Sequence, residues 1–394
     1  SVTQHNPMFI NRLDGHSSLA NSVAMKLVQA KDVVGGEIVR DAKGKPTGVF
    51  KDNAMDAFFA AITPLSEELK DKNLTAAMQF VASKGVTSVQ NMGTWDELAT
   101  FRRARQNNKL ITRIYACVPL TTWAKLDKEV KAKGRGDEWL SIGGLKGFVD
   151  GSLGSHTAVM FAPFVNAPDK KGLLITPADS LYAYTLAADK AGLQVMVHAI
   201  GDKAINTQLN IYQRVMNENG KRDRRFRIEH AQHIAHDDLP RFGAMGVIPS
   251  MQPYHAIDDG RWAEYYIGYE RCRTTYAFQS LIEMGAKPAF GSDWFVAPPT
   301  PLDGIYAAVT RRTLDDKNPD GWIPEQKISV EDALRAYTIN AAFASFEEKI
   351  KGSLEKGKLA DFVLLEKDIT KIAPETIRDV KVLKTIVGGK VVYK

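Results

Sequence analysis

Alternation of strand-like and helix-like segments between residues 80 and 300 constrains the fold of this chain more than any other feature. Apolar runs such as 111–118 and 193–198 read as strands, and helical stretches such as 95–107 and 203–217 separate them. Such alternation predicts a parallel sheet whose strands are joined by crossover helices. We therefore predict an α/β fold, a (β/α)8 TIM barrel.

Only seven barrel strands can be identified, where a closed barrel needs eight. They are expected at 85–90, 111–118, 145–150, 193–198, 227–229, 247–251 and 287–290. A strand preceding residue 85 is missing. The first 80 residues offer a helix over 17–30 and a Gly-rich segment at 35–48, which we interpret as an insertion and lead-in region packed on the barrel.

The C-terminal part has a different pattern. A helix is expected over 329–346, followed by strand-like runs at 356–365 and 380–392 with turn signals between them. Two or three strands alone are marginally stable, so they need partners elsewhere. We predict three regions: the lead-in at 1–80, the barrel at 81–350, and the C-terminal strands of a small β unit outside the barrel at 351–394.

Composition narrows the class of protein. The net charge is +6, but the basic residues are dispersed, and there is no basic stripe with stacking aromatics that would indicate nucleic-acid binding. Two cysteines form no disulfide framework, and no apolar run reaches the length of a membrane span. No signal peptide is visible, which favours the cytoplasm, although the chain starts without Met and its compartment stays undetermined.

Three predicted strands end in a side chain that can bind a metal. These are His198, His230 and Asp293. The carboxyl ends of barrel strands are where such folds place their chemistry, and imidazole with carboxylate suits zinc and similar divalent ions. Each residue alone has an ordinary alternative, a hydrogen-bonded structural histidine or a helix N-cap at Asp293. Their order at successive strand ends favours one or two divalent metal ions, with zinc the expected metal.

Lys146 lies within an otherwise apolar strand that leads into the polar loop 150–157. A buried lysine must find a partner or lose its charge. Carbamylation by CO2 would make it an anionic metal ligand; alternatively its ammonium group pairs with Asp150 or reaches solvent. The loop contains Asp150 and Ser152, which we expect to contact substrate.

Several motifs together resemble the amidohydrolase superfamily, and specifically its YtcJ-like branch, which includes N-substituted formamide deformylases. The motifs include Asp-Gly-His-Ser-Ser at 14–18, Asp-Gly-Ser-Leu-Gly-Ser at 150–155, His-Ala-Ile-Gly-Asp at 198–202, Ile-Glu-His-Ala at 228–231, Met-Gln-Pro-Tyr-His at 251–255, Gly-Ser-Asp at 291–293 and the run 352–363. The resemblance covers nearly the whole chain and is specific as a set.

The resemblance implies roles for individual residues. His198 and His230 would bind metal, Asp293 would bind metal or accept a proton from the attacking water, and Lys146 would be the carboxylated lysine. His255 would lie on the substrate side, or be a loop hydrogen-bonder, and His16 belongs to the first motif and is assigned to substrate binding. The implied fold is a distorted barrel with a metal at its mouth, and it includes a β-sandwich built from both chain ends, to which the strands at 351–394 would belong.

One departure from the family is large. The superfamily's first barrel strand ends in His-x-His, and no two histidines in this chain are two positions apart. With the missing strand, this leads us to expect that the natural protein has a further N-terminal part.

The preferred function is metal-dependent hydrolysis of a C–N bond in an amide, N-formyl or cyclic amide substrate by metal-activated water. One alternative is a truncated or degenerate barrel without catalysis that serves as a binding or regulatory module. Another is a single-metal barrel with a different hydrolytic or isomerising activity. The aromatic-rich segment 254–269 fits either a lid over a small-molecule substrate or a homodimer interface.

Overall fold

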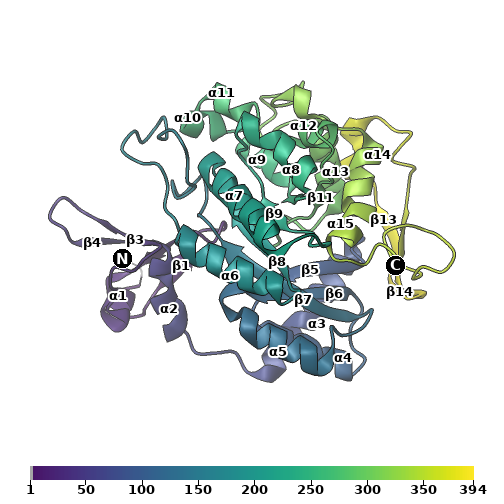
Figure 1. Cartoon of the computed structure of the whole chain (residues 1–394), viewed down its shortest axis with the longest axis horizontal. Helices are drawn as coiled ribbons and strands as arrows, with labels where there is room; N and C mark the ends of the chain where they lie inside the picture. Colours follow the sequence, from purple (N-terminus) through teal and green to yellow (C-terminus); the bar gives the residue numbers. More distant parts are fainter. Residues whose placement is uncertain (1–2) are drawn as a thin grey trace.

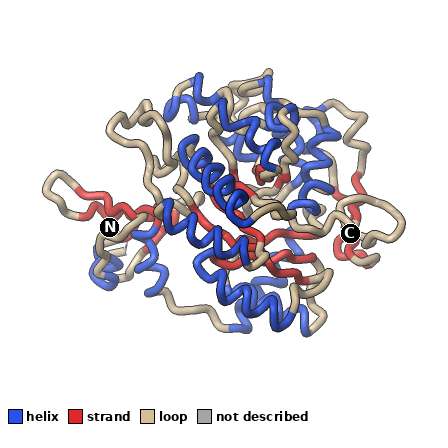
Figure 2. Tube along the Cα trace, in the orientation of Figure 1, coloured by secondary structure: helices blue, strands red, loops and turns tan. Residues whose placement is uncertain are grey.

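The computed structural model describes residues 3–394 and contains three separate sheets (Figures 1 and 2). The central sheet has seven strands in the order β11-β10-β9-β8-β7-β6-β5, and every neighbouring pair is parallel. Its strands are β5 (Ser88–Met92), β6 (Arg113–Pro119), β7 (Leu140–Phe148), β8 (Gln194–Ala199), β9 (Arg227–His230), β10 (Ile248–Met251) and β11 (Ala289–Phe290). The α/β class and the seven-stranded count of the prediction are confirmed.

Two edges of this sheet stay unpaired. Among the described residues, β5 pairs only with β6 and β11 only with β10, so the sheet curls without closing. Strand β7 begins at Leu140, several residues before the predicted start, because Leu140 to Ile142 pair with Ile114 to Ala116 of β6 and the pairing resumes at Gly144 after a bulge.

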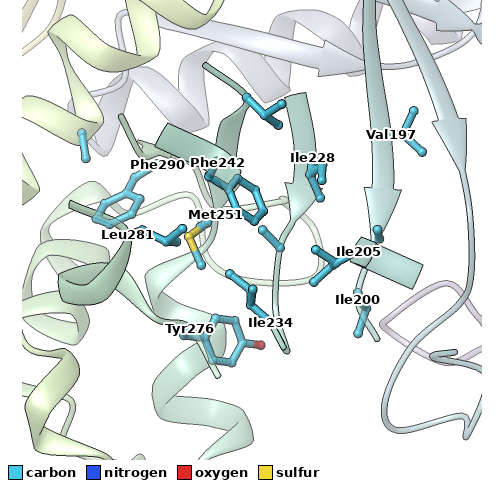
Figure 3. Packing of buried hydrophobic residues seen from close by; sticks show 14 of the residues in the cluster. Val197, Ile200, Ile205, Ile228, Ile234, Phe242, Met251, Tyr276, Leu281 and Phe290 are labelled. Atoms are coloured by element: carbon cyan, nitrogen blue, oxygen red, sulfur yellow. The ribbon is translucent and has the colours of Figure 1, made fainter. Parts of the chain in front are cut away.

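Helices cover the outer face of the sheet (Figure 1). They are α3 (Glu67–Ser83), α4 (Trp95–Gln106), α5 (Trp123–Lys133), α6 (Ala178–Lys190), α7 (Asp202–Asn219), α8 (Leu239–Met245), α12 (Phe278–Glu283) and α13 (Pro301–Thr310). The apolar side chains of α7, including Leu209 and Tyr212, are fully buried. Figure 3 shows part of the resulting core, where Phe242, Met251 and Leu281 meet between strands and helices.

The aromatic-rich segment at 254–269 is largely helical. It forms α9 (Pro253–Asp259), α10 (Ala263–Ile267) and the start of α11 (Tyr269–Cys272). Its aromatic side chains divide between two environments: Tyr266 stacks on His156 of the 150–175 loop, whereas Tyr265 and Tyr269 are exposed.

The predicted helix over 17–30 is wrong in its first part. Ser17–Ala20 is strand β2, which pairs with β1 (Phe9–Asn11) and β4 (Pro46–Asp52), and helix α1 spans only Ser22–Val28. With β3 (Gly36–Arg40) these strands form a four-stranded antiparallel sheet. One face packs against helix α2 (Asp56–Ala61) around Phe50 and Phe58.

The predicted single helix at 329–346 is two helices. Thr338 has non-helical backbone angles (φ −118°, ψ −91°) and separates α14 (Val330–Tyr337) from α15 (Ile339–Ala344). Beyond them, β12 (Phe362–Leu365), β13 (Val382–Val387) and β14 (Lys390–Tyr393) form an antiparallel sheet. This sheet lies at the opposite end of the molecule from the N-terminal sheet and does not pair with it (Figure 1).

A buried ion pair connects the C-terminal sheet to the barrel. Arg113 of β6 donates to both carboxylate oxygens of Asp361, at 2.5 and 2.9 Å, and stacks on Trp139. Asp361 also accepts the backbone N–H of Gly388. Both charged side chains are at most 5% exposed. Removing one partner of such a pair leaves the other charge buried, with neither water nor an opposite charge beside it.

We therefore expect Asp361→Ala to lower the free energy of unfolding by about 3–5 kcal/mol in urea denaturation. Asp127→Ala, which removes the surface pair with Lys131, is the matched control and should change it by less than about 1 kcal/mol. Equal effects of the two substitutions would show that the Arg113–Asp361 pair does not stabilise this junction.

Candidate metal centre

His230, His255 and Asp293 converge at the carboxyl end of the central sheet. Each contributes one ligand atom, and these atoms all lie within 4.8 Å of one another. His230 ends β9, Asp293 follows β11, and His255 lies on α9, which starts directly after β10. Parallel pairing of β9, β10 and β11 brings these three strand ends to one edge.

His255 differs from its predicted surroundings, because it stands on a helix and not on a loop. Its Nε2 is buried and has no hydrogen-bond partner in the part of the chain that the structure describes. A buried polar atom without a partner costs free energy unless something binds it. The donor set of two imidazoles and a carboxylate is one that zinc and related divalent ions use. The residues present therefore fit a metal ion.

The backbone at two of these residues is unusual. His230 has φ +73° and Asp293 has φ +55°, in the left-handed region that residues other than glycine seldom adopt. Such conformations cost free energy and concentrate at functional sites. The two side chains are thus held in directions that ordinary strand geometry would not give them.

Burial favours the neutral form of the imidazoles. It lowers the pKa of His255 to about 4 and lowers the pKa of His230 and of His198 well below the ordinary value. Neutral imidazole is the metal-binding form, so these histidines need not lose a proton to bind an ion. Asp293 as a residue is exposed, yet the protein atoms that surround its carboxylate raise its pKa to about 6, and nearby Lys146 opposes that rise.

His198 lies beside this cluster. Its ring centroid is 4.5 Å from that of His230, while its Nε2 is 3.0 Å from the carbonyl oxygen of Gly151. His230 is held in a similar way, since its Nδ1 is 2.8 Å from Oε1 of Gln252. Oxygen atoms that fix one ring nitrogen leave the other free, which is the usual surrounding of a metal-binding histidine. Sequence reasoning identified neither Gln252 nor the carbonyl of Gly151.

Lys146 is buried on β7 and faces the same region. Among residues 3–394, Nζ has no hydrogen bond or ion pair; it lies 4.8 Å from the ring centroid of Phe148. The alternative pairing of Lys146 with Asp150 is thus not formed. Burial lowers the pKa of Lys146, and the charges of Glu229 and Asp293 partly offset that effect.

Asp150 and Ser152 occupy structural positions. The Asp150 carboxylate is fully buried and accepts the backbone N–H groups of Val159, Ile200 and Gly201 at 2.8–3.0 Å. Ser152 is hydrogen-bonded to Asp14 and Ser155. These contacts are made within the protein, and substrate contact by the two residues stays a prediction. They fix the 150–157 loop over the carboxyl end of the sheet.

His16 enters the site from the N-terminal sheet. Its ring centroid is 4.9 Å from that of His198, and its Nδ1 is 2.7 Å from Oδ1 of Asp52. The three histidines 16, 198 and 230 therefore form a continuous row that extends from the N-terminal sheet to the candidate metal ligands.

A membrane-spanning role finds no support in the helices: none of those within residues 3–394 combines the length and apolar character that crossing a bilayer requires.

Comparison with known proteins agrees with this geometry. The chain is 41% identical to Protein LONG AFTER FAR-RED 3 of Arabidopsis thaliana over 100% of its own length and 70% of that protein's. It is 29% identical to Putative amidohydrolase YtcJ of Bacillus subtilis (98% and 74% covered) and 25% identical to N-substituted formamide deformylase of Arthrobacter pascens (100% and 74% covered).

Among solved structures, an uncharacterized metal-dependent hydrolase from Pyrococcus horikoshii superposes with a TM-score of 0.78 at 29% identity. The superposition covers 94% of this chain and 73% of that one. A family model described as "Amidohydrolase family" matches residues 1–393. With the barrel sheet and the histidine–aspartate cluster at its carboxyl end, these matches establish that the chain belongs to the amidohydrolase family of metal-dependent hydrolases.

Proposed function

We propose that this protein hydrolyses a C–N bond of a small amide-type substrate at a divalent metal, for which zinc is the best candidate. The convergence of His230, His255 and Asp293 carries the proposal. The deformylase among its relatives acts, by its name, on N-substituted formamides, and this supports an amide or N-formyl substrate.

His230, His255 and Asp293 would hold the ion, and His198 would complete its surroundings or bind a second ion together with Lys146. A divalent ion at this position supplies a water molecule of lowered pKa and polarises a carbonyl group. The chain's own residues orient that chemistry: Gln252 and the Gly151 carbonyl fix the two imidazoles.

Asp293 is the candidate proton carrier. A carboxylate at this position can accept a proton from water and return it to a leaving amine. Lys146 in its ordinary form places a positive charge near Asp293; as a carbamate it would supply an anionic oxygen to the metal.

A second candidate function is a binding or regulatory module without catalysis. The observation that favours it is the open sheet: β5 has no partner on one side, so no strand from the described residues lies between it and β11. Metal content and hydrolysis discriminate between the two candidates. A metal-loaded protein that cleaves an N-substituted formamide is an enzyme, whereas a protein that takes up neither zinc nor substrate fits the module.

His230→Ala should abolish zinc binding, because it removes the ligand whose ring is fixed by Gln252 at the centre of the cluster. The measurement is the zinc-to-protein ratio after loading and dialysis, by elemental analysis. His236→Ala is the matched control, since its side chain is 88% exposed, and should keep the wild-type ratio. Stoichiometric zinc in His230→Ala would contradict the ligand assignment.

Lys146→Met should stabilise the metal-free protein, by about 1–3 kcal/mol near pH 7, because it replaces an unpaired buried amine with an apolar side chain of similar length. The folded state lowers the pKa of Lys146, so wild-type stability falls as the pH drops from the pKa of the unfolded lysine to that lowered pKa, and the full penalty is present below it. The gain should therefore shrink above pH 10, where the unfolded lysine is also neutral.

Urea unfolding at pH 7 and pH 10.5, with a chelator present, measures this difference. A substitution that is equally destabilising at both pH values would show that Lys146 has a favourable partner in the folded protein.

A further inference from the structure

The last residues of the β2–β4 ladder bring His16 and Asp52 together. Ser17 pairs with Lys51 in antiparallel register, so His16 and Asp52 are the next residues outward on the two strands. The backbone N–H of Asp52 donates to the carbonyl oxygen of His16. Their side chains meet as well, with 2.7 Å between Nδ1 of His16 and Oδ1 of Asp52. The geometry of the N-terminal sheet thus builds this pair.

Burial of Asp52 in its observed conformation costs free energy of folding. Its side chain is fully buried, its Oδ2 has no hydrogen-bond partner among the described residues, and its φ is +47°. Burying a carboxylate with unsatisfied capacity destabilises a fold. The 150–157 loop packs closely against Asp52, because a Cβ added to Gly151 would lie only 2.8 Å from Oδ1 of Asp52. Within residues 3–394, the one side chain that hydrogen-bonds this carboxylate is His16.

The bond to Asp52 determines which nitrogen of His16 is available. A carboxylate accepts a hydrogen bond, so in the neutral imidazole Nδ1 carries the proton and Nε2 is an acceptor. The ring lies 4.9 Å from the ring of His198, and its side chain is only 13% exposed. In that neutral form, Nε2 is the hydrogen-bond acceptor that His16 offers beside His198.

We propose that Asp52 is a positioning residue that holds His16 as an acceptor for the N–H group of a bound amide. The inference rests on the proposed function and sharpens its substrate class: amides that keep an N–H, such as N-monosubstituted formamides, are preferred over fully substituted amides. The N-terminal sheet thereby contributes directly to substrate selection. Asp52 acts through His16 and does not contact the substrate.

Two matched hydroxamates test this role without requiring turnover. Acetohydroxamate and N-methylacetohydroxamate share a metal-binding head, and only the first has an N–H. We expect the zinc-loaded full chain to bind acetohydroxamate about tenfold more tightly in calorimetric titrations, the worth of one hydrogen bond. His16→Ala and Asp52→Ala should reduce this ratio to near one while the zinc content stays at the wild-type level. His236→Ala, an exposed histidine, should keep the tenfold ratio.

The possible results separate cleanly. A wild-type ratio near one, or an unchanged ratio in His16→Ala, would overturn the inference, and so would loss of zinc from His16→Ala, which would make His16 a metal ligand. If Asp52→Ala does not fold, Asp52→Asn replaces it, because it keeps the shape of the side chain. The ratio of the two hydroxamate affinities in Asp52→Asn should lie below the wild-type value. An unchanged wild-type ratio would contradict the positioning role of Asp52. A wild-type protein that takes up no zinc would refute the proposed function, and this inference with it.

Discussion

Parallel pairing of β8, β9, β10 and β11 is the constraint on which the site depends. Strands that run in the same direction end at the same edge, so residues dispersed over almost a hundred positions of sequence meet there. Ala199 pairs with His230, and Met251 with Phe290, which fixes how far each strand end projects. His230 belongs to the first of these pairs, and His255 and Asp293 lie a few residues beyond Met251 and Phe290. A slip of one residue in any pair would turn a ligand away from the cluster.

Beneath the ligands, a buried polar layer supports the same strands. Arg227 of β9 makes two hydrogen bonds to Glu229, at 2.7 and 3.0 Å, and also donates to Gln90 of β5 and Ser250 of β10. This network joins strands across the interior of the sheet, where a closed apolar core would otherwise be expected. It places the Glu229 carboxylate close enough to Lys146 to oppose the lowering of the lysine pKa. The buried charges of Arg227 and Glu229 therefore influence the protonation of Lys146 at the site above them.

Much of this arrangement could be predicted from the sequence, because it depends on local patterns. The alternation of apolar runs and helical stretches located the seven strands, and their terminal polar residues indicated His230 and Asp293. His255 is predicted to lie beside the substrate and not in the cluster. In the structure it joins the cluster, because helix α9 begins at Pro253, directly after β10, and redirects its side chain. The spacing of apolar residues in the sequence does not indicate that change in direction.

Other features depend on pairing between distant segments. Ser17–Ala20 resembles the start of a helix, yet strand partners on both sides override that local preference. The pairing of His16 with Asp52 joins positions that are 36 residues apart. The hydrogen bond from the backbone N–H of Ile200 to Asp150 joins the 150–157 loop to the end of β8. Residue type predicted that Asp150 and Ser152 were polar loop residues, but only the folded chain shows that their hydrogen-bonding groups are occupied.

The central claim is that His230, His255 and Asp293 hold a metal ion. Anomalous diffraction at the zinc absorption edge, from crystals of the zinc-loaded protein, tests it most directly. The account predicts a peak within about 2.0–2.2 Å of the imidazole nitrogens of His230 and His255 and of a carboxylate oxygen of Asp293. A peak at a different set of residues, or no peak at this edge of the sheet despite stoichiometric zinc, would contradict it.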